Sequence, residues 1–248
     1  MGRGLLLAML LWRPTHARAQ GNPQSESAVQ PVTAHAIRWY EVTVAAAGVG
    51  ALMLVDESVQ RFAQRDRSPA TNDMASVFRH AGQPEVFGTV SLGLVAAGVV
   101  THRPAITAAG GRLVATLGLA GAATVILKAL IGRARPDADA GAFDFDPFTH
   151  SDALPSGHAS MAFALAAGLS EAVHSKWAHV GFYGFAAGTA LSRINDNRHW
   201  LSDVGMGALI GITSAKLVSG RWRVFGLGPP GVAVGPRRTL IFGWQRRF

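Results

Sequence analysis

The sequence predicts an all-α protein, a bundle of about six helices that is embedded in a membrane. Two observations support this prediction. Of the 248 residues, 49% are apolar and only 15% are charged, whereas ordinary soluble domains carry about 25% charged residues. The apolar residues also gather into six long stretches that contain no Asn, Asp or Pro, a pattern that favours helix.

The first nineteen residues are expected to be a signal peptide or an uncleaved leader. Arg3 supplies a positive start, Gly4 to Trp12 is apolar, and Ala17-Arg18-Ala19 has the small-x-small pattern of a cleavage site. Residues 20–36 are then a polar linker. With or without cleavage, we expect the chain to be exported or inserted into a membrane.

The six apolar stretches make up an expected helical domain over residues 37–220. They are Val42–Val55, Val86–Val100, Leu113–Leu127, Ala159–Val173, Trp177–Leu191 and Val204–Val218. Small residues at close spacing let helices approach closely in lipid. Each stretch is shorter than the roughly 20 residues of a membrane span, but charged residues at its ends could snorkel and extend it. Membrane spans are favoured over a soluble exported bundle.

The charges between the stretches predict an orientation. If all six stretches span, one face carries residues 56–85, 128–158 and 192–203, with nine Lys and Arg against twelve Asp and Glu. The other face has eleven Lys and Arg against two Glu. Because cytoplasmic loops are the ones rich in Lys and Arg, the first face should look outward, towards the periplasm. Both termini would then lie inside, which conflicts with a cleaved signal peptide, and both alternatives stay open.

Several other features exclude classes of function. The chain has no cysteine, so it has neither a disulfide framework nor a thiolate metal site. Its net charge is +8, but the basic residues are scattered and form no platform with aromatic residues, so nucleic acid is not an expected partner. The aspartates of residues 137–148 lack the spacing of a calcium loop. The tail, residues 221–248, is rich in Gly and Pro and could form a hairpin, and it is assigned no chemistry.

Three short polar segments lie at the ends of apolar stretches on the expected outward face. They are KALIGRARP (128–136), LPSGHASM (154–161) and SRINDNRHWLSD (192–203). Helix ends on one face of a bundle can converge on one pocket. We therefore expect the active site at helix ends on this face.

The basic residues of these segments predict an anion site. Lys128, Arg135 and Arg193 are cations in apolar surroundings, and unpaired cations there suggest that an anion pairs with them. Arginine binds phosphate oxygens through two parallel hydrogen bonds, whereas lysine supplies a compact charge. Ser156 is placed to cap a helix, and Gly157 lets the free backbone amides approach an anion.

Two histidines supply the reactive groups. His199 and Asp203 are four residues apart and so share one face of a helix. A carboxylate on one ring nitrogen fixes the tautomer and leaves the other nitrogen free to attack. His158 is placed to protonate a leaving oxygen. The set predicts phosphoryl transfer without a metal or another cofactor, whereas a non-enzymatic anion-binding or transport protein would have no need of the histidine–aspartate pair.

The remaining basic groups are interpreted without a role in the chemistry. Arg133 and Arg198 are taken as solvated neighbours of the site. Five further histidines have no matching partners and are expected at surfaces or interfaces, namely His80, His102, His150, His174 and His179.

The three segments together resemble the signature of the type 2 phosphatidic acid phosphatase and vanadium haloperoxidase superfamily. Its positions are filled in order by Lys128, Arg135-Pro136, Pro155-Ser156-Gly157-His158, Ser192-Arg193, His199 and Asp203. The resemblance covers roughly residues 80–218. It implies a nucleophilic His199 that Asp203 orients, a general acid and base at His158, and phosphate binding by Lys128, Arg135, Ser156, Gly157 and Arg193.

The phosphatase branch is favoured, because haloperoxidases of this superfamily are much longer chains. We expect a metal-independent phosphatase of phosphate monoesters or diphosphates, acting through a phosphohistidine. The expected substrate is a lipid such as phosphatidic acid, a phosphatidylglycerol phosphate or a polyprenyl diphosphate, reached from the outer face of the cell membrane. The alternative is a soluble periplasmic acid phosphatase with a broad range of small substrates. The sequence does not indicate an oligomeric state.

Overall fold

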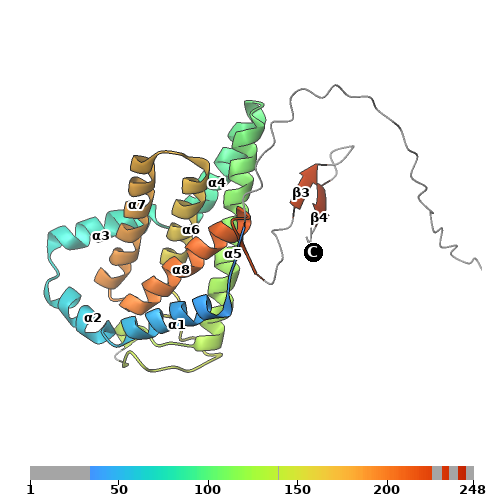
Figure 1. The fold of residues 1–248 in the computed structure, drawn as a ribbon. Coiled ribbons are helices and arrows are strands. Elements are labelled where there is room, and N and C mark those ends of the chain that lie inside the picture. Colours follow the sequence, from blue (N-terminus) through green and yellow to red (C-terminus); the bar gives the residue numbers. More distant parts are fainter. Residues whose placement is uncertain (1–33, 139, 225–230, 235–239, 244–248) are drawn as a thin grey trace, which may run out of the picture. The chain divides into compact units, whose positions relative to one another are not determined.

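The computed structural model describes residues 34–138, 140–224, 231–234 and 240–243. The expected leader, residues 1–19, lies outside the described residues. The described elements are, in chain order, β1 (His35–Ala36), α1 (Trp39–Met53), α2 (Asp56–Arg65), α3 (Pro69–Ala81), α4 (Pro84–Val100), α5 (Pro104–Ile131), the 3-10 helix η1 (Pro136–Ala138), α6 (Gly157–Ala172), α7 (Lys176–Asn195), α8 (Leu201–Val218), β2 (Trp222–Arg223), β3 (Gly231–Val234) and β4 (Leu240–Gly243) (Figure 1).

The predicted all-α bundle is confirmed, and each of the six apolar stretches lies almost wholly within a helix. These helices are α1, α4, α5, α6, α7 and α8. The structure adds two helices, α2 and α3, that a search for apolar stretches does not find, because both are rich in polar residues. The third stretch is also longer than expected, since α5 has 28 residues.

The helices begin and end where the local sequence directs. Prolines at positions 69, 84 and 104 start α3, α4 and α5, because the first turn does not use the amide that proline lacks. Gly132 ends α5 with a φ of 59°, a backbone conformation that favours glycine. A Cβ at this position would also collide with the carbonyl group of Asp146. The chain therefore turns sharply here and sends residues 133–135 back across the end of the bundle.

Helix α6 lies at the centre of the bundle, between α7 and α5 in Figure 1, and packs most extensively against α8. Two glycines of α8 make this close approach possible. A Cβ on Gly207 would lie 2.8 Å from the carbonyl oxygen of Ser156, and one on Gly211 would lie 2.5 Å from the backbone nitrogen of Ala164. The close packing fixes the start of α6 against the start of α8.

Two described helices, α5 and α8, are long and apolar enough to cross a membrane. Two bent pairs, α1 with α2 and α3 with α4, would raise the number of such spans to four, with bends of 48° and 44°. Apolar side chains of α5 also lie on the surface, including Val125 (67% exposed) and Ile126 (57% exposed). An apolar helix surface of this kind is typical of a protein that contacts lipid.

Two small two-stranded sheets complete the described structure. Strand β1 pairs parallel with β2, which joins the segment before α1 to the segment after α8. Strands β3 and β4 pair antiparallel as a hairpin, in the tail where the sequence suggests one.

Candidate active site

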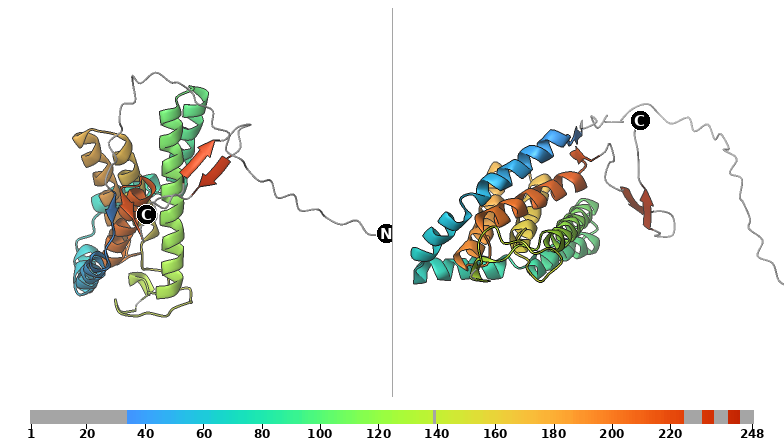
Figure 2. Two further views of the ribbon diagram at one scale, coloured as in Figure 1. Left: turned by 45° about the vertical axis from the view of Figure 1, so that its right-hand side comes forward. Right: turned by 90° about the horizontal axis from the view of Figure 1, so that it is seen from below.

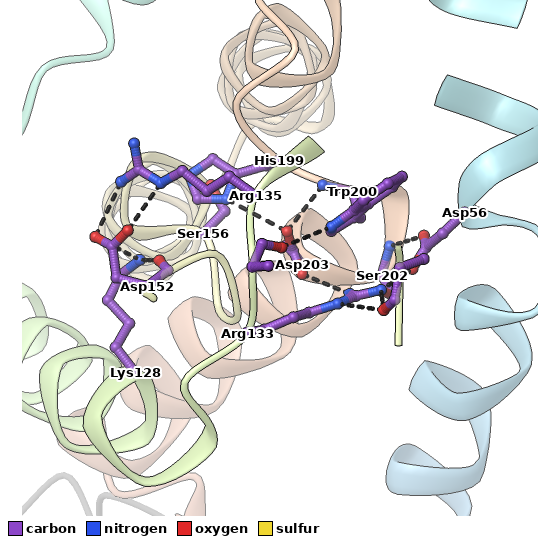
Figure 3. A network of polar contacts seen from close by, with 12 residues as sticks. Asp56, Lys128, Arg133, Arg135, Asp152, Ser156, His199, Trp200, Ser202 and Asp203 are labelled. Atoms are coloured by element: carbon purple, nitrogen blue, oxygen red, sulfur yellow. Dashed lines mark hydrogen bonds and ion pairs between the residues drawn. The ribbon is translucent and has the colours of Figure 1, made fainter. Parts of the chain in front are cut away.

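The three polar segments meet at one end of the bundle, where α5 and α7 end and α6 and α8 begin (Figure 2). The long connection between α5 and α6 covers this end and contributes residues 133–156. All the helix ends that carry expected site residues therefore lie on one face. Figure 3 shows the polar network that joins them.

His199 and Asp203 face each other as their spacing predicts. Nδ1 of His199 lies 3.5 Å from Oδ2 of Asp203, and the two side chains are 5% and 0% exposed. This separation is an ion-pair distance that is longer than a good hydrogen bond, and such contacts often tighten only when substrate binds. Because Nδ1 faces the carboxylate, Nε2 is the nitrogen free for attack.

Arg133 corrects the sequence interpretation, because it is fully buried instead of solvated. Its Nη1 donates to Oδ1 of Asp203 at 2.7 Å, and its Nη2 donates to Oδ2 of Asp56 at 2.7 Å. The guanidinium also donates to the hydroxyl of Ser202 and to the carbonyl oxygen of Ala142. A buried charge requires such partners, so Arg133 links α2 to the aspartate that faces His199.

Backbone hydrogen bonds hold the reactive segments together. The amide of Trp200 donates to Oδ2 of Asp203 at 2.8 Å, and its indole nitrogen donates to the carbonyl oxygen of Ala134 at 3.0 Å. The amide of Ser156 donates to the carbonyl oxygen of Asp203 at 3.0 Å. Asp203 therefore ties the start of α6, the start of α8 and the segment after α5 to one another.

Lys128 and Arg135 share a carboxylate partner that the sequence interpretation did not include. Nη2 of Arg135 donates to Oδ2 of Asp152 at 2.9 Å, and Nε of Arg135 lies 2.8 Å from Oδ1 of the same carboxylate, an ion-pair distance. Nζ of Lys128 lies 3.6 Å from Oδ2 of the same residue and also donates to its carbonyl oxygen. The expectation that these cations are unpaired is therefore wrong, because a loop carboxylate reaches both of them.

Arg193 has a carboxylate partner as well. Its Nη1 lies 2.9 Å from Oδ2 of Asp196, which also lies 3.0 Å from Nη1 of Arg79. The Nε group of Arg193, however, is buried and has no hydrogen-bond partner. One donor of this guanidinium thus remains available to a bound anion.

Ser156 occupies the expected N-cap position of α6, but its hydroxyl does not cap the helix. The oxygen Oγ is buried and has no partner. Since a buried hydroxyl normally finds a hydrogen bond, this group is also available to a ligand at the helix start. Gly157 follows as the first residue of α6, where the free backbone amides favour an anion.

The electrostatics around His158 favour its neutral form. Burial, followed by the neighbouring charges of Arg193 and His199, lowers the pKa of His158 to about 4. Burial also lowers the pKa of His199, against the opposing effect of Asp203. A neutral His199 is the form that can attack, whereas a neutral His158 must gain a proton before it can act as an acid.

Within the described part of the chain, no cluster of His, Asp and Glu side chains could hold a metal ion. The five histidines without an expected role lie at or near the surface, and one of them, His150, lines a cavity beside Arg135 and Asp152. His80, His102, His150 and His174 are exposed, and His179 lies near the surface with its Nε2 at 2.6 Å from the carbonyl oxygen of Val173.

Sequence reasoning did not single out Asp56 or Asp152, and it undervalued Arg133. Asp56 lies outside the three polar segments, 77 residues from Arg133. A signal was present, since Asp56 follows an apolar stretch directly and stands at the expected outward face. Without the fold, nothing in the sequence distinguishes it from the other charged residues of α2.

The chain resembles known proteins over the same region. The family model described as the PAP2 superfamily matches residues 109–224. The lipid A 1-phosphatase of Porphyromonas gingivalis is 40% identical over 97 residues, which make up 38% of this chain and only 19% of that protein.

Two solved structures share the fold. The transmembrane PAP2-type phosphatidylglycerolphosphate phosphatase of Bacillus subtilis is 25% identical, with a TM-score of 0.58 over 73% of this chain and 92% of that one. Aquifex aeolicus LpxE is 22% identical, with a TM-score of 0.54 over 66% and 94% of the two chains.

Proposed function

We propose that the protein is a membrane-bound phosphatase of lipid phosphates in the PAP2 superfamily, whose family model matches residues 109–224, and that it acts through a phosphohistidine. The observation that carries the proposal is the buried pair of His199 and Asp203. A purely structural histidine has no need of an aspartate that is itself held by Arg133 and by the amide of Trp200.

In the first step, Nε2 of His199 attacks the phosphorus atom, and the bond from phosphorus to the alkoxy oxygen breaks. His158 gives its proton to the leaving oxygen. Asp203 stabilises the positive charge that develops on the imidazole ring. The product of this step is an N-phosphorylated His199 and a free alcohol.

In the second step, His158 takes a proton from water, and the resulting hydroxide attacks the phosphorus atom. The P–N bond breaks, which returns His199 to its neutral form and releases inorganic phosphate. Lys128, Arg135 and Arg193 neutralise the charge on the phosphoryl oxygens, and Ser156 together with the first amides of α6 donates hydrogen bonds to them.

The surroundings of the site support a lipid as the substrate. An apolar groove of about 520 Å³ lies between α1, α5 and α8 and is lined by residues that include Met53, Leu119 and Met206. It reaches Ile131 at the end of α5 and Leu154, two residues before Ser156. A chain of methylene groups could therefore leave the reaction site through apolar surroundings.

The proposal is tested with purified protein in detergent micelles that contain phosphatidic acid and excess chelator. We expect release of inorganic phosphate, inhibition by vanadate, and no turnover by His199→Ala. A rapid acid-free quench with labelled substrate should trap a phosphorylated protein whose label is stable to alkali and labile to acid. Activity that requires a divalent metal, or that persists in His199→Ala, would overturn the mechanism.

Location is tested separately, because the chemistry does not depend on it. We propose that the site faces the periplasm from the cell membrane, on the strength of the apolar α5 and α8 and of the charge distribution. Alkaline carbonate should leave the activity in the membrane pellet. Activity that is released by this wash would favour the soluble periplasmic alternative.

A further inference from the structure

A second basic cavity lies next to the candidate active site. It has a volume of about 390 Å³, and its lining consists of four arginines and one aspartate, Arg67, Arg79, Arg193, Asp196 and Arg198. We call it the arginine pocket. Its residues come from the segment between α2 and α3, from α3, and from the end of α7 and the connection to α8.

The carboxylates that contact these arginines do not match them in number. Asp196 is shared by Arg79 and Arg193, at 3.0 and 2.9 Å. Arg67 donates to two neutral oxygens, Oδ1 of Asn72 at 3.1 Å and Oε1 of Gln64 at 3.2 Å. Nη1 of Arg198 lies 2.5 Å from Oδ2 of Asp137, a residue that does not line the pocket. Among the described residues, four guanidinium groups therefore face two carboxylates.

The most buried member of the pocket has an unused donor. Arg193 is 7% exposed, and its Nε group is buried without a hydrogen-bond partner. Leaving a charged donor unsatisfied costs free energy unless a ligand supplies the acceptor. Arginine presents its donors in a planar fork that fits the oxygens of a phosphate group. The excess of guanidinium groups over carboxylates points to a phosphate-bearing ligand in the pocket, and Arg193, whose free donor serves the transferred phosphate, lies between the two sites.

The arginine pocket and the candidate active site share a wall. Arg193 belongs to both, and Arg198 directly precedes His199 in the chain. The charge of Arg193 is also close enough to His158 to lower the pKa of that histidine. A substrate whose reacting phosphate lies at His199 would therefore bring neighbouring atoms of its headgroup towards the pocket.

We infer that the arginine pocket binds a second phosphate of the same headgroup, one that is not transferred to His199. This inference rests on the proposed function. It narrows the substrate class from any lipid phosphate to lipids that carry two phosphate groups in the headgroup. The second phosphate would hold the headgroup in place while the first one reacts.

Two lipids separate this inference from simple phosphatase activity. Phosphatidic acid has one phosphate, whereas phosphatidylglycerol phosphate has a terminal phosphomonoester and a bridging phosphodiester. In both lipids the leaving group is a primary alcohol, so the chemistry at His199 is matched. We expect the wild-type protein to show a kcat/KM about tenfold higher for the lipid with two phosphates.

The diagnostic variant is Arg67→Gln, because Arg67 is exposed and is not part of the catalytic set. It should remove most of the preference for phosphatidylglycerol phosphate while it affects hydrolysis of phosphatidic acid much less. Arg65→Gln is the matched control. It removes the same charge two residues earlier, at the end of α2, where Arg65 is exposed and its Nε lies 3.4 Å from Oδ1 of Asp66, a residue that does not line the pocket. The control should retain the full preference.

The outcomes separate the two levels of the proposal. If the wild-type protein hydrolyses neither lipid, the proposed function fails. If the wild-type protein hydrolyses both lipids with the same kcat/KM, and Arg67→Gln changes neither of these two values, the inference alone is overturned. Inorganic phosphate is added in a further arm. A purely competitive effect on phosphatidic acid agrees with the inference, whereas a non-competitive effect that is lost in Arg67→Gln would assign the pocket to free phosphate.

Discussion

Oδ2 of Asp56 lies 2.7 Å from Nη2 of Arg133, and neither side chain is exposed, although 77 residues separate the two. The same guanidinium donates to Asp203, which faces His199 (Figure 3). One charged network therefore runs from α2 to the proposed nucleophile. Its members are buried, so each of them depends on the others for a partner.

Asp56→Asn should destabilise the protein, because it removes one of the two carboxylates that neutralise the buried Arg133. Breaking a buried ion pair from one side costs about 3 kcal/mol or more. We expect a clear fall in the unfolding temperature in detergent. Asp66→Asn is the control, because Asp66 is half exposed in its pair with Arg65 and such pairs contribute about 0–1 kcal/mol. Equal shifts in the two variants would contradict the buried network.

The pH dependence of the reaction should reflect the low pKa of His158. The free protein holds this pKa at about 4, so the protonated acid needed for the first step becomes scarcer as the pH rises above that value. We expect kcat/KM to fall with rising pH over the acidic range. The bound phosphate dianion favours the protonated imidazole, so kcat should fall at a higher pH than kcat/KM does.

His158→Ala provides the control for that profile. With an aryl phosphate, whose leaving group needs little protonation, the variant should retain much of its activity and lose this dependence on pH. Hydrolysis of phosphatidic acid by the same variant should be strongly reduced, because its alkoxide needs the proton. A variant that loses activity equally on both substrates would show that His158 does not act as the general acid.

Asp152→Asn should strengthen the binding of phosphate and vanadate. Although burial raises the pKa of Asp152, Lys128 and Arg135 outweigh this effect and lower it, so the carboxylate is charged when an anion arrives between the same two cations. Removing this repulsion should reduce the inhibition constant about fivefold, a change on the order of 1 kcal/mol. Asp146→Asn, in an exposed part of the same loop, is the control. A higher inhibition constant in Asp152→Asn would mean that its charge chiefly holds the cations in position.

Gly211→Ala should damage the bundle even though the new side chain is one methyl group. Its Cβ would collide with the carbonyl oxygen of Ser160 and the backbone nitrogen of Ala164, so α8 would have to move away from α6. We expect a lower unfolding temperature and a loss of activity, since the shift separates Ser156 from Asp203. Gly118→Ala on α5 is the matched control, with no atom within 4 Å of its new Cβ. Similar behaviour of both variants would rule out close packing as the reason for the glycine.

The sequence predicts the helices that are apolar and misses those that are not. The stretches of α1 and α4–α8 stand out because most of their side chains are apolar. The polar α2, in contrast, has no apolar stretch, and its sequence does not distinguish the buried Asp56 from the other charged residues of the helix. Position relative to other helices decides which charge is buried, and a single sequence does not contain that information.

The dependence of burial on the fold also explains why the sequence analysis interpreted Arg133 as solvated. Arg133 and Arg135 lie two residues apart in one segment, yet the turn at Gly132 sends the first into the interior and leaves the second beside Asp152. Their order in the sequence gives no hint of this difference. The meeting of the three polar segments was predictable, because helix ends on one face of a bundle converge. Their carboxylate partners Asp56 and Asp152 come from α2 and from the α5–α6 connection, whose positions were not predictable.

The position of Asp56 determines which part of this protein can be used as a truncated fragment or in a chimera. A fragment confined to the family-matched residues 109–224 would keep Lys128, His158 and His199. The fragment would, however, lack α2 and therefore the carboxylate of Asp56, which pairs with the buried Arg133. The unit that can be transplanted into a chimera, or shortened to a minimal enzyme, therefore includes α2 and not only the segment that sequence similarity delimits.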